Sequence, residues 1–159
     1  MHLDRKYSYR RTLPHLLKDN RPIFVTFGTY KRWSLPADAR QLVFECCLRE
    51  HLATIDLHAV VVMPTHAHLL FTALRDEEGW LVSLPQIMRL IKGRSANFIN
   101  KLLDRRGRVW QEESFDHVLR SNESLMEKAN YICQNPVRAG LVRSIADYPW
   151  LWQGELPVL

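Results

Sequence analysis

The alternation of apolar and polar residues predicts four strands along the chain. Residues 23–29 and 109–119 are rich in β-branched and aromatic side chains, and longer apolar runs cover 55–62 and 66–73. Pro64 separates the two longer runs. Because proline cannot donate a hydrogen bond within a central ladder, these runs are expected to be consecutive strands joined by a tight break.

Three segments repeat apolar residues at the spacing of an α-helix: 36–52, 85–103 and 122–135. The last is expected to end before Pro136, since a residue that precedes proline disfavours helical backbone. Gly93 should weaken the second helix locally. The predicted buried stripe of this second helix consists of Ile87, Leu90, Ile91, Phe98 and Leu102.

The predicted order, β-α-β-β-α-β with an appended helix, is the ferredoxin-like split β-α-β arrangement. We therefore expect an α+β fold with an antiparallel sheet, helices on one face and a C-terminal helix added to this unit. The 159 residues correspond to a single domain, 1–159. It divides into a basic N-terminal arm at 1–20, a core at 21–135 and a C-terminal tail at 136–159.

The composition narrows the class of protein. With 47% hydrophobic and 25% charged residues, the chain is not expected to be disordered. Its three cysteines, two of them adjacent, give no disulfide framework, which favours a reducing cytoplasm. The sequence has no apolar run of membrane-spanning length and no secretory signal pattern, so we expect a cytoplasmic protein without a membrane span.

The net charge of +5 is concentrated in two blocks. Residues 1–32 hold eight basic and two acidic side chains, and residues 89–108 hold seven basic and one acidic. The rest of the chain is acidic. Basic blocks in an otherwise acidic chain favour a polyanionic partner such as nucleic acid, although solvated helix faces are also rich in lysine and arginine.

The most distinctive local pattern is the pair His66 and His68 in a predicted strand. Residues two apart in a strand project from the same face, so both imidazoles could bind one metal ion. The alternative is a pair of ordinary surface histidines, because an isolated H-x-H pattern is common.

A second pattern lies on the third predicted helix. One stripe of that helix presents Ser124, Lys128, Tyr131 and Asn135. An apolar stripe adjoins it, so the helix buries one face and offers a lysine, a tyrosine and an amide beside that face. Tyr131 could be a nucleophile with the Asn135 amide as a third metal ligand. The alternative is a tyrosine at the rim of the core.

Together these patterns resemble a known family. Residues 63–70, MPTHAHLL, resemble the HUH signature, histidine–hydrophobic–histidine, of single-strand DNA endonucleases. Residues 131–142, YICQNPVRAGLV, resemble the tyrosine segment of the REP-associated tyrosine transposases, which are relatives of single-tyrosine insertion-sequence transposases. The resemblance extends over about residues 9–150.

This resemblance implies a transposase: a metal-dependent single-strand DNA endonuclease and strand transferase. Such an enzyme cleaves hairpin-associated single-stranded DNA through a covalent 5′-phosphotyrosine intermediate. By position, Tyr131 would be the nucleophile, and the metal, Mg²⁺ or Mn²⁺, would be bound by His66, His68 and Asn135.

The partner implied is single-stranded or hairpin DNA. The resemblance favours a monomer, with a homodimer as the alternative. The predicted phosphate contacts are Arg5, Lys6, Arg10, Arg11, Arg89, Lys92, Arg94 and Lys128. His117, next to Asp116, could support the metal site or be a structural residue. Two alternatives stay open: a non-catalytic DNA-binding descendant of such enzymes, and a metal-dependent phosphodiesterase that uses water as its nucleophile.

Overall fold

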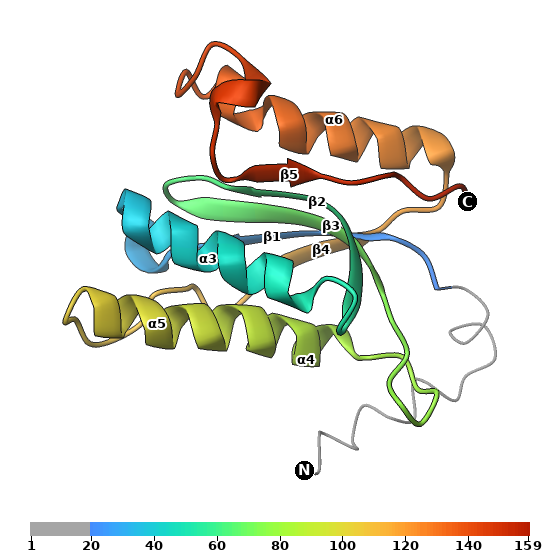
Figure 1. Ribbon diagram of the computed structural model, residues 1–159, viewed down its shortest axis with the longest axis horizontal. Helices are drawn as coiled ribbons and strands as arrows, with labels where there is room; N and C mark the ends of the chain where they lie inside the picture. The colour runs from blue at the N-terminus through green and yellow to red at the C-terminus, as the bar shows by residue number, and fades with distance from the viewer. Residues whose placement is uncertain (1–19) are drawn as a thin grey trace.

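The predicted strands form one antiparallel sheet in a computed structural model that describes residues 20–159 (Figure 1). Its strands are β1 (Ile23–Gly28), β2 (Ile55–Val62), β3 (His66–Ala73), β4 (Phe115–Val118) and β5 (Leu151–Gln153). They lie in the order β4-β1-β3-β2-β5, and every neighbouring pair is antiparallel. The first four strands therefore have the ferredoxin-like arrangement, which confirms the predicted α+β fold.

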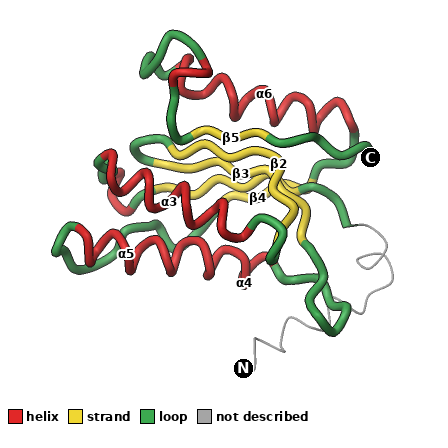
Figure 2. The backbone as a smooth tube through the Cα atoms, viewed as in Figure 1, coloured by secondary structure: helices red, strands yellow, loops and turns green. Residues whose placement is uncertain are grey.

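Helices cover both faces of the sheet, in two layers (Figure 2). One layer contains α3 (Ala37–Glu50), α4 (Leu84–Met88), the π-helical turn η3 (Arg89–Gly93) and α5 (Arg94–Leu102). The other layer is the C-terminal helix α6 (Asn122–Arg138), followed by a 3₁₀ turn at Ile145–Asp147. Another 3₁₀ turn, η2 (Tyr30–Arg32), follows β1.

Each face of the sheet has its own apolar core. Alternate residues of β1 illustrate the division: Val25 and Phe27 belong to the core beneath α3 and α5, and Phe24 belongs to the core beneath α6. Among the residues that the structure describes, no helix is both long and apolar enough to cross a membrane.

The second predicted helix is divided by the π-helical turn, and this changes its buried face. Ile87 and Ile91 are buried as expected, but Phe98 and Leu102 are exposed, and Ser95 and Ile99 are buried instead. A π-helical turn accommodates one extra residue and so rotates the following turns relative to the preceding ones. A stripe drawn at constant helical spacing is therefore wrong beyond Gly93.

The prediction that the third helix ends before Pro136 is also wrong, because α6 continues to Arg138. Its end is instead fixed by Gly140, which has a left-handed backbone (φ 74°). The amides of Gly140 and Leu141 donate to the carbonyls of Val137 and Pro136, each at 3.0 Å, in the pattern of a Schellman motif. Pro136 has no backbone N–H to donate, but it lies in the last turn of α6, so the helix tolerates it.

Two further differences concern the ends of the sheet. The segment 109–119 pairs as a strand only at β4, and Trp110 is buried with its indole donating to Ser95 Oγ at 3.0 Å. The tail contributes β5, which was not predicted because three residues are too few to show an alternation.

Candidate functional site

The two histidines of the H-x-H pattern lie together on the α6 side of the sheet. His66 and His68 alternate with Ala67 along β3, and their ring centroids are 4.8 Å apart. On the neighbouring strand β1, Thr26 is opposite His68 and Gly28 is opposite His66. The predicted common orientation of the two imidazoles is thus a feature of the structure.

His68 has one ring nitrogen bonded and one left open. Its Nδ1 lies 2.7 Å from Thr26 Oγ1, whereas its Nε2 is buried and has no hydrogen-bond partner among residues 20–159. Burial, followed by the positive charges of His66, Arg138 and Lys128, lowers the pKa of His68 to about 3. The imidazole is therefore neutral at physiological pH, which is the state that binds a metal ion.

His66 is half-buried at the end of β3 nearest the preceding turn. Its Nδ1 lies 3.3 Å from Thr65 Oγ1. Burial, and then the charge of Arg32, lowers the pKa of His66, so this imidazole also favours the neutral form. Arg32 belongs to η2, where both Lys31 and Arg32 have positive φ values, of 52° and 55°. Such backbone is costly for residues with side chains and is concentrated at functional sites.

Tyr131 of α6 lies against His68 of this pair. Its ring centroid is 5.3 Å from that of His68, and the rings meet edge to face. The tyrosine is 41% exposed, so its side chain is open to a ligand from solvent. Among the described aromatic contacts, Phe24 of β1 supplies the other ring beside Tyr131, at 6.1 Å.

Two cations hold positions against Tyr131. The Arg138 guanidinium lies 4.4 Å from the centre of the Tyr131 ring and donates to the Tyr131 carbonyl at 3.0 Å. The Lys128 ammonium lies 5.8 Å from the same ring and 4.7 Å from that of Phe24. These interactions orient the tyrosine, and they give the surrounding surface a positive charge that suits a phosphate.

The residues present fit a metal ion bound by two imidazoles and an amide. His68 Nε2 is a buried nitrogen in need of a partner, and His66 is beside it. Asn135, one turn after Tyr131, is only 8% exposed. In the described part of the chain, no three His, Cys, Asp or Glu side chains cluster suitably for a metal, so a third protein ligand would have to be of another type. An amide oxygen, such as that of Asn135, is a donor of that type.

The two residues predicted to support the site lie on different faces of the edge strand β4. His117 is in register with Phe24, so it is on the same face as His68. Asp116 is in register with Val25, whose side chain is in the core of the opposite face. The structure therefore brings His117, but not Asp116, to the α6 side of the sheet.

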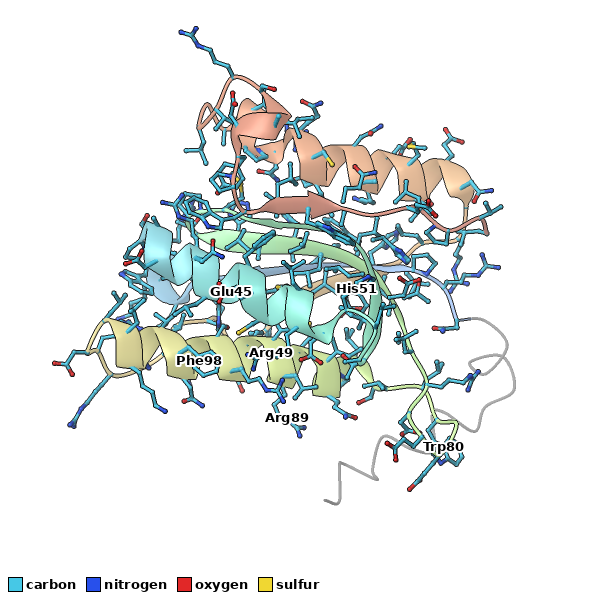
Figure 3. All side chains as sticks on the ribbon, viewed as in Figure 1. Glu45, Arg49, His51, Trp80, Arg89 and Phe98 are labelled. Atoms are coloured by element: carbon cyan, nitrogen blue, oxygen red, sulfur yellow. The ribbon has the colours of Figure 1, made fainter. Side chains whose placement is uncertain are left out.

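The basic residues of the second predicted helix lie in the helical layer opposite α6, as Figure 3 shows for Arg89. Arg94 forms an ion pair with Glu50 at 3.1 Å. Lys92 Nζ donates to the carbonyls of Gln111 and Glu112, at 2.7 and 3.2 Å, and to Ser114 Oγ at 3.1 Å. The structure does not bring these three residues together with Tyr131. Arg5, Lys6, Arg10 and Arg11 lie outside the described residues.

Three residues of the site were not predicted: Thr26, Arg32 and Arg138. Arg138 had a detectable signal, because it follows Tyr131 by two helical turns once α6 is known to continue past Pro136. Thr26 and Arg32 reach the histidines through the pairing of β1 with β3 and through an unusual turn. Neither can be predicted from spacing along the chain.

No family model matches this chain. In sequence it is similar to a Haemophilus influenzae protein assigned to the REP-associated tyrosine transposases, with 26% identity over 97 residues. It is also similar to a REP-associated tyrosine transposase of Escherichia coli, with 23% identity over 95 residues. The matches cover 58% and 60% of this chain, and 55% and 52% of the relatives. The chain thus matches about half the length of these curated relatives.

The fold is similar to that of a solved REP-associated tyrosine transposase bound to a REP hairpin. The TM-score is 0.65, with 20% identity over 88% of this chain and 89% of that one. A bacterial tRNA(His) guanylyltransferase-like protein in complex with ATP has a TM-score of 0.50 and 14% identity, covering 91% of this chain and 68% of its own. Because a fold can host unrelated activities, function has to be argued from the site.

Proposed function

We propose that this relative of the REP-associated tyrosine transposases is a metal-dependent single-strand DNA endonuclease and strand transferase. One observation carries the proposal: a buried, unpartnered imidazole nitrogen of His68 lies beneath an exposed tyrosine, Tyr131, that is flanked by cations. The open nitrogen alone does not identify a site, because Nδ1 of the buried His58 also has no hydrogen-bond partner in the described part of the chain. The tyrosine and the cations beside His68 are what set its surroundings apart from those of a structural histidine. This arrangement instead suits a metal ligand next to a nucleophile.

His66, His68 and Asn135 are the residues that would hold the metal, Mg²⁺ or Mn²⁺. When bound, such an ion polarises a phosphate and offsets the charge of its transition state. Thr26 contributes by fixing the tautomer of His68: a proton on Nδ1 donates to Thr26 Oγ1, which leaves the lone pair on Nε2.

Tyr131 is the proposed nucleophile. Its phenolic oxygen forms a bond to phosphorus as the bond to the 3′ oxygen of the preceding nucleotide breaks. The phenolic proton is lost, the departing 3′ oxygen takes up a proton, and the 5′ phosphate stays on the tyrosine. Because the phosphodiester is exchanged rather than hydrolysed, a 3′-hydroxyl can later reverse the step and reseal a strand.

The cations around the tyrosine have separate roles in this proposal. Arg138 stacks on the ring and fixes its direction, and Lys128 lies close enough to attract a phosphate. Arg32 is on the other side, near His66. Preorganised positive charge at the reacting phosphate stabilises the charge that develops in the transition state.

The proposed substrate is single-stranded DNA next to a hairpin, acted on by a monomer. Support for the hairpin comes from the solved relative of similar fold, which is bound to a REP hairpin. The N-terminal arm, with four of the predicted phosphate contacts, is proposed to bind flanking DNA.

The test uses end-labelled single-stranded hairpins taken from the DNA that flanks the gene. The wild-type protein with Mg²⁺ or Mn²⁺ should cleave them at one position, whereas a duplex of the same sequence should be bound weakly. His66→Ala and His68→Ala should abolish cleavage and retain most of the salt-dependent binding, because affinity comes mainly from phosphate contacts. Binding without cleavage by the wild type would instead identify a non-catalytic DNA-binding protein.

A further inference from the structure

The α6 side of the sheet is only partly covered. Helix α6 packs mainly over β2, β3 and β5, and all four residues of the edge strand β4 are exposed. Phe115 is the most exposed aromatic residue of this strand, at 60%. An aromatic ring in solvent beside a polar site calls for a functional explanation, since neither core packing nor the proposed metal and nucleophile accounts for it.

The strand register places Phe115 in line with the site. Phe115 is opposite Thr26 on β1, and Thr26 is opposite His68 on β3. Directly paired residues project from the same face, so Phe115 lies two strands, or about 10 Å, from His68. Phe115 and the proposed metal ligand are therefore parts of one continuous surface.

Thr26 is the residue between them on β1. It is half-buried and turned to His68, and it is small. Beside it, at Gly28, an added Cβ would be in ordinary van der Waals contact with the Thr65 carbonyl oxygen at 3.6 Å and with the Gln111 side chain at 3.8 Å. A flat molecule that extends from the histidines to Phe115 would therefore cross β1 at Thr26.

The charge of this surface indicates the kind of molecule that would lie there. Lys128 is above Phe24, the residue of β1 that pairs with His117 of β4, and Arg138 is against Tyr131. An exposed aromatic ring next to cations that can attract phosphate is typical of single-strand nucleic-acid binding, in which bases stack on rings and the backbone follows the positive charge.

We propose that Phe115 is a stacking platform for a nucleobase next to the phosphate at Tyr131. The strand would cross β1 at Thr26, and one unpaired base would lie on the Phe115 ring. This inference rests on the proposed function for the position of the DNA. It adds a base-binding subsite on β4 to a site otherwise made of β1, η2, β3 and α6.

The experiment measures the binding of single-stranded hairpins by fluorescence anisotropy, with the metal chelated so that no strand is cut. Each base near the cleavage position is replaced in turn by an abasic nucleotide. The proteins are the wild type, Phe115→Ala, Phe115→Trp and Phe98→Ala. Phe98 is the matched control, because it is an exposed phenylalanine, at 36%, on α5 in the opposite layer (Figure 3).

For one nucleotide, the abasic change should weaken wild-type binding about tenfold, and Phe115→Ala should weaken binding of the intact DNA by a similar factor. Combining the two should cost little more than either alone, because both remove the same contact. In Phe115→Trp, binding should again be weakened by the abasic nucleotide. Phe98→Ala should behave as the wild type.

The proposal would be overturned if the losses of affinity from Phe115→Ala and from the abasic nucleotide were additive at every DNA position. Unchanged affinity in a folded Phe115→Ala protein would also overturn it. Sedimentation velocity addresses a different occupant, a second copy of this chain at the β4 edge: a dimer that Phe115→Ala dissociates, without base-specific coupling, would also overturn it. Because the readout is binding, a wild type that shows the coupling but never forms a covalent adduct would contradict the proposed catalysis and leave the stacking subsite in place.

Discussion

Two buried histidines of the same sheet, His68 and His58, have similar local bonding but differ in the charged groups around them. Each has one ring nitrogen close to a threonine hydroxyl: His68 to Thr26 at 2.7 Å, and His58 to Thr72 at 2.8 Å. Burial lowers the pKa of both. For His68 the neighbours His66, Arg138 and Lys128 lower the pKa further, whereas for His58 Asp56 raises the pKa and His51 lowers it.

The difference shows what separates a candidate site from a structural histidine. Burial, a threonine partner, an unpartnered second ring nitrogen and a neighbouring imidazole are common to both residues, so none of these features alone identifies function. His68 is distinguished by an exposed tyrosine and two cations within reach, which suit a phosphate beside a metal ion. His58 lies near the tail, where the backbone of Glu155 favours the protonated ring.

The largest expected effect is the difference in cleavage rate between variants of the two histidines. His68→Ala should reduce the rate of single-strand cleavage by about 10³-fold or more, since a metal ligand and the local charge balance are lost together. The cleavage rate of the His58→Ala variant should stay within a few-fold of the wild-type rate. Single-turnover cleavage of a labelled hairpin measures both rates, and thermal melting confirms that each variant is folded. Equal losses in the two variants would remove the distinction.

The next largest effect concerns Arg138, the cation that lies against Tyr131 beside His68. Arg138→Met keeps the aliphatic stem and removes the guanidinium, and it should slow cleavage about 100-fold. The matched control is Arg143→Met, because Arg143 is an exposed arginine just beyond α6. If both variants cleave at the same rate, Arg138 neither orients the tyrosine nor stabilises the transition state.

A smaller effect tests the threonine partner of His68. Thr26→Val preserves the shape of the side chain and removes the hydroxyl that fixes the His68 tautomer, so Mn²⁺ affinity should fall about 10- to 100-fold. Thr26→Ser should retain most of it. Isothermal titration calorimetry gives both affinities without DNA. Wild-type affinity in Thr26→Val would mean that the hydrogen bond does not prepare His68 for a metal.

The smallest effect concerns His58 and pH. Its pKa is lower in the folded protein than the ordinary value of about 6.5, so the unfolded chain binds more protons once the pH falls below that value. The contribution of neutral His58 to the free energy of unfolding is therefore fully present above pH 6.5, and it is lost as the pH falls toward the pKa of His58 in the folded protein. Urea unfolding between pH 7.5 and 5 should therefore show a shallower loss for His58→Gln than for the wild type. Parallel curves would contradict this assignment.

Much of the fold could be predicted from the sequence because its elements are locally encoded. The apolar runs of β2 and β3, and the break at Pro64 between them, match the structure residue for residue. The failures arise where the backbone departs from a regular period or where an element depends on distant partners. The π-helical turn at Arg89–Gly93 altered the buried face of a helix, and β5 exists only by pairing with β2.

The candidate site divides in the same way. His66 and His68 share a face of the strand, and Lys128 and Tyr131 share a stripe of the helix, as the strand and helix periods predicted. That the tyrosine lies against the histidine pair was implied only by the resemblance to the transposase family. The partners that prepare them come from strand register and from the end of α6, as with Thr26 and Arg138. Charge alone was a poor guide to position, because Lys92 and Arg94 have structural partners in the opposite layer.

The most direct test of the account is to locate the covalent adduct on the protein. Wild-type protein is incubated with a single-stranded hairpin and metal, digested with a protease and analysed by mass spectrometry. The account predicts a 5′-phosphorylated nucleotide linked to Tyr131 and a free 3′-hydroxyl on the other fragment, with neither product formed by Tyr131→Phe. An adduct on another residue, or cleavage by Tyr131→Phe at the wild-type rate, would contradict the central claim and favour a hydrolase that uses water.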